Sequence, residues 1–188
     1  TVCLMQKTGE IFSYDTTSQT YNAQTLDGYS EDNLKTWNTL LYQNYYEPGS
    51  TMKVMTLASA IDDGVFNPNE VISTINGITV ADTTINDWNV NEGMTSVQYL
   101  TYAQGFAWSS NVAMTSLEQK MGNDKWLTYL SRFKFGYPTR FGMLNEDSGL
   151  LPSDNEVTVA MSSFGQGIGV TQVQMLRALQ LSLMVVSC

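Results

Sequence analysis

A serine and a lysine three residues apart stand where a helix is expected to begin, in the stretch YEPGSTMKVMTLASAIDDG of residues 46–64. Residues i and i+3 share one face of a helix, so the hydroxyl of Ser50 and the amine of Lys53 can meet. The first turn of a helix also offers unpaired N–H groups and the positive end of the helix dipole, which favour negative charge near the serine. The pair can therefore act as a nucleophile and its base, provided that burial or a neighbouring cation lowers the pKa of the lysine.

The simpler interpretation is a helix cap at Ser50 and a surface charge at Lys53. A lone S-x-x-K motif is short and made of common residues, so on its own this interpretation is favoured. Lys53 lies beside the apolar positions Val54 and Leu57. Partial burial of the lysine is therefore the prediction that separates the two interpretations.

A second candidate motif, Ser109-Ser110-Asn111 in the stretch FAWSSNVAM, lies between two expected helices. Taken alone it is an ordinary N-cap for the helix that begins near Asn111. Brought over Lys53, the hydroxyl of Ser109 could relay a proton and the amide of Asn111 could hold a substrate carbonyl. Ser109 follows Ser50 by 59 residues (109 − 50), which leaves room for a lobe that folds back over the first helix.

The composition excludes several other chemistries. Histidine is absent, and the cysteines are two, Cys3 and Cys188. A Ser-His-Asp triad, a Cys-His pair, a His-ligated zinc ion and a four-cysteine zinc site are therefore impossible. The formal charge of −9 argues against nucleic acid as a partner. We predict no metal and no cofactor, and a catalytic base that is lysine, a carboxylate or a second hydroxyl.

The hydrophobic pattern predicts the elements that position these residues. Residues 1–14 predict a β-hairpin around the turn Lys7-Thr8-Gly9-Glu10, and residues 15–45 a long surface connection. Residues 65–93 indicate turns and short strands. A helix is predicted from Ser50 to Gly64, with a buried face of four apolar residues at helical spacing, Val54, Leu57, Ala58 and Ile61.

The remainder of the chain is predicted to be mainly helical. Residues 140–156 indicate a loop, and a final helix begins at Thr171, a candidate cap, and covers residues 172–179. No apolar run approaches the roughly 20 residues that span a bilayer, so we expect a soluble segment. Three more helices are expected, over residues 97–107, 111–121 and 124–134, the last entered through Asn123 as a cap.

The two motifs together resemble the signature of the penicillin-binding, active-site-serine enzymes. The resemblance runs from about Lys7 to Leu179, through the segments NYYEPGSTMKVM, DWNVNEG, AQGFAWSSNVAMTSLEQKMG, RFKFGYPTRFG and SSFGQGIGVTQVQM. These are similar to successive segments of class B penicillin-binding proteins, most of all of the 2X type. The resemblance implies the α/β (α+β type) fold of the serine β-lactamases and transpeptidases, with the hairpin in an antiparallel sheet beside a helical body.

The resemblance also implies a function, that of a D,D-transpeptidase that cross-links peptidoglycan stem peptides and is acylated by β-lactam antibiotics. Ser50 would be the acylated nucleophile, and Lys53 the base that activates it. Ser109 would shuttle a proton, and Asn111 would bind the amide of the peptide or the β-lactam. Three further residues are expected to bind substrate, namely Thr51, Trp88 and Gln166, although for Trp88 a buried core aromatic is an equal alternative.

Such an enzyme works at the extracytoplasmic face of the bacterial cell membrane. The resemblance therefore implies that the full-length protein is held there by an N-terminal anchor that lies outside this segment.

The chain departs from the family pattern at its third motif, Lys-Ser/Thr-Gly, which should follow the other two. Lys7-Thr8-Gly9 precedes them and is interpreted as the hairpin turn, and no such triplet follows Asn111. The strands and the final helix expected after residue 179 are missing as well. We therefore expect residues 1–179 to be the N-terminal part of a transpeptidase domain. Alone, this part should be poorly stable, prone to aggregation and essentially inactive, because its hairpin lacks neighbouring strands.

The last residues, 180–188, depart abruptly from the family. Family text of the kind LTAISNGGVM, read with one nucleotide lost after the leucine, gives the LQLSLMVVSC found here. We hypothesise that this tail is the product of a frameshift, the alternative being a truncation with an unrelated end. The nucleotide sequence after codon 179 distinguishes the two.

Other functions stay open on the sequence alone. A penicillin-recognising sensor module would keep acylation of Ser50 without an acyl acceptor, and an inactive truncated remnant would lose both. A serine β-lactamase is less favoured, because no E-x-x-L-N type loop is found near residues 145–156. Stable acylation, transfer of the acyl group to an amine, and turnover of a β-lactam separate these alternatives.

Overall fold

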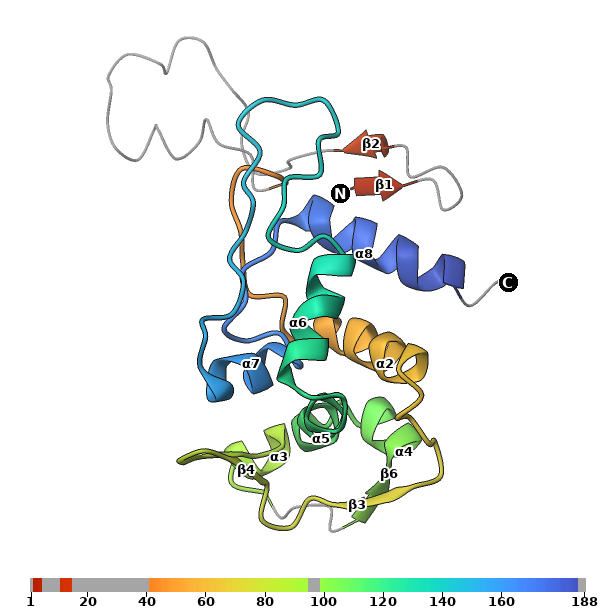
Figure 1. Cartoon of the computed structure of the whole chain (residues 1–188), viewed down its shortest axis with the longest axis vertical. Helices are drawn as coiled ribbons and strands as arrows, with labels where there is room; N and C mark the ends of the chain where they lie inside the picture. The colour runs from red at the N-terminus through yellow and green to blue at the C-terminus, as the bar shows by residue number, and fades with distance from the viewer. Residues whose placement is uncertain (1, 5–10, 15–40, 95–98, 186–188) are drawn as a thin grey trace.

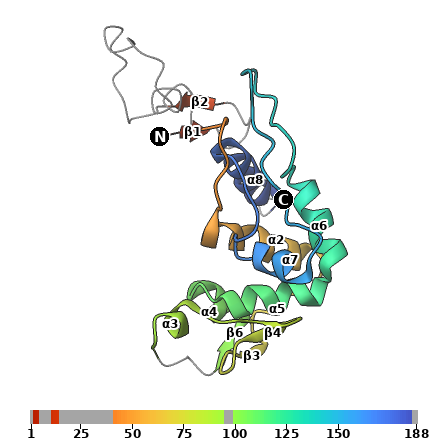
Figure 2. The same cartoon turned by 90° about the vertical axis from the view of Figure 1, so that its left-hand side faces the viewer.

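The computed structural model of the 188-residue chain describes residues 2–4, 11–14, 41–94 and 99–185. In this part a body of helices lies between strand pairs at its two ends (Figures 1 and 2). The pair β1–β2 lies near helix α8, and the other strands lie at the opposite end with α3 and α4.

The helices enclose a large hydrophobic core. It includes the fully buried side chains of Met55, Met114, Leu117 and Trp126. A buried hydrogen bond of 2.8 Å from Trp126 Nε1 to Ser162 Oγ joins α6 to α7. The helical elements are the 3₁₀ turn η2 (Gly49–Met52), α2 (Lys53–Asp62), α3 (Trp88–Asn91), α4 (Tyr102–Ala107), α5 (Asn111–Met121), α6 (Asn123–Arg132), α7 (Glu156–Ser162) and α8 (Gln172–Val185).

The strands of the described residues form antiparallel pairs. These pairs are β1 (Val2–Leu4) with β2 (Ile11–Tyr14), β3 (Val71–Ser73) with β6 (Tyr99–Thr101), and β4 (Ile78–Val80) with β5 (Thr83–Ile85). The first pair confirms the predicted hairpin. Its turn at Lys7-Thr8-Gly9 lies outside the described residues, as does most of the predicted connection over 15–45. The β4–β5 pair and α7 share a small second hydrophobic core. This core also includes Phe164, which follows α7.

The predicted buried face of α2 is wrong. Ile61 is 55% exposed, and Val54, Leu57 and Ala58 are only partly buried. The buried face carries Lys53, Met55, Thr56, Ser59 and Ala60 instead. The hydroxyl side chains of Thr56 and Ser59 can be buried there because each donates a hydrogen bond, as in the 2.6 Å bond from Thr56 Oγ1 to Ser163 O.

Several predicted boundaries also need correction. Within the segment expected to be helical over 97–107, Tyr99–Thr101 form strand β6, because Thr101 pairs with β3 and then caps α4 in a capping box with Gln104. Asn123 lies inside α6, which starts after Gly122. Helix α7 was not predicted, and α8 continues past residue 179. Thr171 does cap α8, since its Oγ1 accepts a hydrogen bond from Gln174 N at 3.2 Å.

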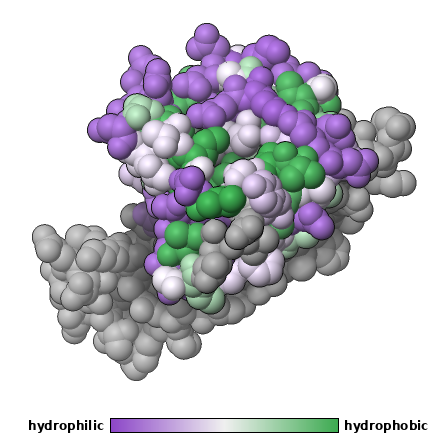
Figure 3. Space-filling view, turned by 90° about the horizontal axis from the view of Figure 1, so that it is seen from below, coloured by the Kyte–Doolittle hydropathy of each residue, from purple (hydrophilic) through white to green (hydrophobic). Residues whose placement is uncertain are grey.

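The end of the molecule opposite the hairpin exposes some apolar side chains, among them Val71, Ile75 and Met94. Figure 3 shows this end, where hydrophobic residues form separate patches between hydrophilic ones. On the described part of this face no single apolar surface dominates.

Candidate active site

The loop that follows α7 holds the beginning of α2. Gly49 N donates a 3.0 Å hydrogen bond to Gly165 O, and Thr56 Oγ1, about two turns further along, donates to Ser163 O. Gly165 has a φ of +86°, and a Cβ there would lie 2.1 Å from Gly49 O. Only glycine allows the two backbones to come this close, so the position of Ser50 is set by a contact between distant segments.

Ser50 does not act as a helix cap. The residue before η2 is Pro48, which has no capping side chain, and Ser50 itself lies inside the turn. Its side chain is exposed. The Ser50 Oγ accepts a 3.1 Å hydrogen bond from Ser109 Oγ. The cap interpretation is therefore wrong for Ser50, and its hydroxyl faces the second motif.

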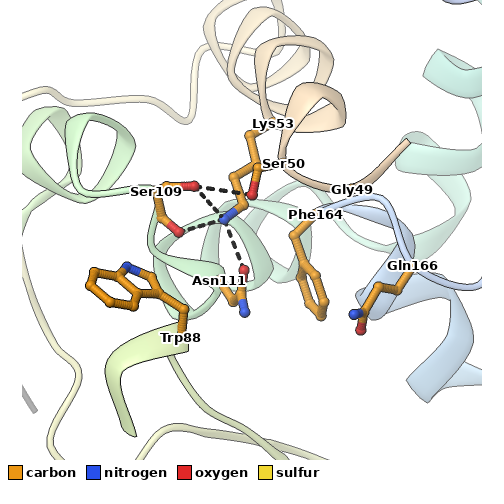
Figure 4. A pocket seen from close by; sticks show the side chains of 8 residues that line it. All are labelled: Gly49, Ser50, Lys53, Trp88, Ser109, Asn111, Phe164 and Gln166. Atoms are coloured by element: carbon orange, nitrogen blue, oxygen red, sulfur yellow. Dashed lines mark hydrogen bonds between the residues drawn. The ribbon is translucent and has the colours of Figure 1, made fainter. Parts of the chain in front are cut away.

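Lys53 is not a surface charge, since only 2% of it is exposed. Its Nζ donates to Ser109 O at 2.5 Å, to Ser109 Oγ at 3.0 Å and to Asn111 Oδ1 at 2.8 Å. These bonds converge on the amine from the second motif, and Ser50 is reached through Ser109 (Figure 4). The predicted burial of Lys53 and its contact with the second motif are thus present.

Burial lowers the pKa of the Lys53 amine to about 8, and the negative charge of Asp87 opposes this shift. Desolvation disfavours the charged form of a buried amine. About a tenth of Lys53 is therefore neutral at pH 7, far more than for an ordinary lysine, and the neutral amine is the form that a general base needs.

The second motif forms a turn that serves both structure and chemistry. Ser110 is the N-cap of α5, its Oγ accepting a 3.0 Å hydrogen bond from Ala113 N. The cap interpretation is thus correct for the middle residue of the motif. It leaves Ser109 and Asn111 on either side to face Lys53. Ser109 has a φ of +60°, which is unusual for a residue with a side chain.

These residues line a pocket of about 400 Å³. Trp88 forms one side of it and is 39% exposed, so the alternative of a buried core aromatic is wrong. Its ring lies against Trp108, with centroids 5.5 Å apart. Gln166 lies exposed at the other side (Figure 4). The lining residues are Gly49, Ser50, Lys53, Trp88, Ser109, Asn111, Phe164 and Gln166.

A comparison with known protein families identifies this arrangement. The family described as "Penicillin binding protein transpeptidase domain" matches residues 1–181. The chain belongs to this transpeptidase family. The match reaches beyond residue 179, and the different origin of residues 180–188 stays a prediction.

Relatives of the transpeptidase family include characterised cell-wall proteins. The chain is 35% identical to penicillin-binding protein PbpB of Mycolicibacterium smegmatis over 69% of its own length and 20% of that protein. It is 31% identical to peptidoglycan D,D-transpeptidase FtsI of Escherichia coli K12 over 90% of its length and 28% of that protein. The chain thus spans between a fifth and about 28% of the length of these two curated relatives.

A solved transpeptidase-family structure supports the fold. Penicillin-binding protein 2X of Streptococcus thermophilus is 54% identical, with a TM-score of 0.84 over 95% of this chain and 26% of that one. The predicted α+β transpeptidase fold is therefore confirmed for the part of the domain that the chain covers. Among the described residues no helix is long and apolar enough to cross a bilayer.

The transpeptidase pocket differs from the sequence prediction at two points. Thr51 is not brought into it, because its Oγ1 donates to Pro48 O at 2.6 Å. Gly49 and Phe164 line the pocket although neither was predicted. Gly49 precedes Ser50 and Phe164 lies two residues before Gln166, and no chemical signal marks an apolar lining residue in a sequence. No group of three potential metal-ligating side chains occurs within the described ranges.

Proposed function

We propose that this chain carries the acylating residues of a peptidoglycan D,D-transpeptidase, with Ser50 as the nucleophile and Lys53 as its base. The observation that carries the proposal is the buried Lys53 amine, bonded to Ser109 and Asn111 while the exposed Ser50 hydroxyl bonds to Ser109. The substrate class, a peptidoglycan stem peptide or a β-lactam that mimics it, is inferred from the relatives' names.

The partners of Lys53 suit both protonation states of its amine. A charged ammonium donates three hydrogen bonds, to Ser109 O, Ser109 Oγ and Asn111 Oδ1. A neutral amine has two donors and one lone pair. The two carbonyl oxygens take the donors, and the Ser109 hydroxyl rotates to donate to the lone pair. The amine can therefore gain or lose a proton without a heavy atom changing partner.

The proposed acylation step follows from this network. Ser50 Oγ attacks the carbonyl carbon while its proton passes to Ser109 Oγ, and the Ser109 proton passes to Lys53 Nζ. A C–O bond forms, the C–N bond breaks, and the departing nitrogen receives a proton back along the same path. Transfer to the amine of a second stem peptide reverses the sequence. Asn111 Nδ2 donates one hydrogen to Asn86 O at 3.2 Å, which leaves the other for a substrate carbonyl.

A β-lactamase is disfavoured by the same pocket. Hydrolysis of the acyl-enzyme needs a carboxylate that activates water, and no aspartate or glutamate is among the described residues that line the cavity. Trp88 and Gln166 are proposed to contact the substrate from opposite sides of the pocket. We further propose that the full-length protein works at the extracytoplasmic face of the cell membrane, where its peptidoglycan substrate lies.

The proposal is tested by trapping the acyl-enzyme. The full chain is incubated with a fluorescent penicillin and the adduct is mapped by mass spectrometry. In the folded fraction of the chain we expect labelling on Ser50, its loss in Ser50→Ala, and acylation about 10²- to 10⁴-fold slower in Lys53→Ala. Ser153→Ala, an exposed serine of the loop before α7, is the matched control and should label normally. An adduct on Ser109 would overturn the assignment.

A chimera extends the test to acyl transfer. Residues 41–181 of this chain replace the matching residues of penicillin-binding protein 2X of S. thermophilus, whose structure they resemble. Transfer to an added amino-acid amine supports the transpeptidase. Stable acylation without transfer would point to a sensor, and rapid hydrolysis to a β-lactamase. If neither the chain nor the chimera labels, the residues belong to an inactive remnant.

A further inference from the structure

Asp87 is a buried carboxylate at the edge of the site, only 3% exposed. It stands at the N-cap position of α3, yet its side chain makes no hydrogen bond to that helix. It accepts hydrogen bonds from Ser110 Oγ on both oxygens, at 2.8 and 2.9 Å, and from Val112 N at 3.0 Å. Asp87 therefore caps the start of another helix, α5, where the helix dipole also favours a negative charge.

The turn that Asp87 holds carries Ser109 and Asn111. Ser109 has its backbone in the left-handed region, a conformation that persists only where surrounding contacts impose it. On its C-terminal side the contacts come from Asp87 and from Asn86, whose carbonyl accepts a hydrogen bond from Asn111 Nδ2. Residues 86–87 thus fix the turn to which the Lys53 amine is bonded.

Asp87 also acts on the charge of Lys53. Among the charged side chains of the described ranges, it is the one whose charge favours the protonated amine, against the effect of burial. The neighbours that contact the amine directly are neutral, namely the hydroxyl and carbonyl of Ser109 and the amide of Asn111. The buried carboxylate of Asp87 therefore does two things. Its negative charge favours the protonated Lys53 amine, and its hydrogen bonds fix the turn whose groups bind that amine.

We propose that Asp87 is a positioning residue of the acyl-transfer site. It holds the Ser109–Asn111 turn over Lys53, and its negative charge favours the protonated form of the Lys53 amine. The inference rests on the proposed roles of Ser50 and Lys53. Its two parts can be separated, because the turn needs an acceptor oxygen whereas the amine responds to the negative charge.

Two variants separate the parts. Asp87→Asn keeps Oδ1, which can accept from both Ser110 Oγ and Val112 N, but removes the charge. Its acylation by the fluorescent penicillin should stay near normal at alkaline pH, with the midpoint of the pH–rate profile about one unit lower. Asp87→Ala removes the acceptor too. The turn is then released, and acylation should be about 100-fold slower at every pH.

Asp82→Asn is the matched control, because Asp82 is an exposed acid in the turn between β4 and β5. It should change neither the rate nor the midpoint. A second readout does not need acylation: the Cε resonance of ¹³C-labelled Lys53 is titrated by NMR, with Lys53→Arg to assign it. All variants are measured in the full chain and in the chimera, with circular dichroism as the check on folding.

Each outcome is decisive. If the wild type is acylated and Asp87→Ala reacts within threefold of Asp82→Asn, the positioning role is refuted. If Asp87→Ala does not fold, the isosteric Asp87→Asn decides through its pH midpoint, and an unchanged midpoint refutes the charge effect. If the wild type is not acylated, the proposed function fails, while the NMR titration still tests Asp87. A Lys53 pKa equal in wild type and Asp87→Asn then overturns the inference, and a lower one in the variant supports it.

Discussion

The contact between Gly165 and Gly49 makes Gly165→Ala a sharp test of how Ser50 is positioned. The new Cβ would lie 2.1 Å from Gly49 O, which is 1.3 Å closer than the 3.4 Å at which ordinary van der Waals contact begins. The obstacle is backbone, so the start of α2 and the loop after α7 must move apart by about that amount. A misplacement of about 1 Å in a catalytic group costs roughly 100-fold in rate, equivalent to about 2.7 kcal/mol. We expect acylation of Ser50 by a fluorescent penicillin to slow by about this factor.

Gly64→Ala is the control for the backbone strain alone. Gly64 has a φ of +75°, and nothing lies within 4 Å of the position of its Cβ. It follows the far end of α2, so its strain should lower the melting temperature without moving Ser50. Both variants are assayed for acylation rate and for thermal unfolding. Equal acylation rates in the two variants would mean that the Gly165–Gly49 contact does not set the position of the nucleophile.

Titration and core variants provide three more tests. Acylation should speed up with pH and level off above about 8, because burial lowers the pKa of Lys53 and only the neutral amine accepts a proton; a flat profile in stopped-flow measurements would contradict this. Neither carboxylate oxygen of the buried Glu118 has a described hydrogen-bond partner, and burial raises its pKa to about 7. The folded state therefore binds this proton more tightly than the unfolded state, and stability is lost as pH rises through about 7. Glu118→Gln should raise the melting temperature by about 3 °C or more on the alkaline side of that value and by less on the acid side, and the reverse order in calorimetry would refute the assignment. Trp126→Phe loses the buried bond to Ser162 and should cost about 1–3 kcal/mol in chemical unfolding, whereas the exposed Trp108→Phe should cost about 0.5 kcal/mol or less; equal costs would contradict the burial argument.

The pairing of the two sequence motifs could be predicted, but its geometry could not. Residues 50 and 53 are close in any helix, so their meeting is a local matter. The contact of Lys53 with Ser109 and Asn111 joins residues 56 and 58 positions apart. The spacing of the motifs allowed this contact, and the family resemblance favoured it over the cap interpretation.

The burial of Lys53 was predicted for an incorrect reason. Helical spacing predicts that Val54 and Leu57 lie on the buried face of α2, with Lys53 at its margin. The structure buries the opposite side, where Met55 and Thr56 face the core. Helical periodicity predicts the buried face of a helix from the polarity of its side chains. It does not show which hydroxyls can be buried because they donate a hydrogen bond, as Thr56 does to Ser163 O.

Asp87 shows a second limit of local rules. An aspartate before a short helical segment is expected to cap that segment. Here the carboxylate bonds to Ser110 and Val112, more than twenty residues later in the chain. A cap of this kind satisfies the same N–H groups as a local one, and local sequence does not distinguish them.

Ser50 lies far in the sequence from Ser109 and Asn111, the groups proposed to activate it. The reactivity of the serine should therefore depend on folding. In a newly made chain Ser50 and Lys53 are already neighbours, but the amine is still hydrated and carries its proton, because Ser109 and Asn111 have not yet docked on it. Under the proposed roles, the serine stays an ordinary, unreactive alcohol until the turn that carries Ser109 and Asn111 has docked on Lys53. Under the proposed function, covalent labelling of Ser50 by a penicillin would count only those molecules in which this docking is complete, and the drug would double as a probe of folding that needs no added fluorophore on the protein.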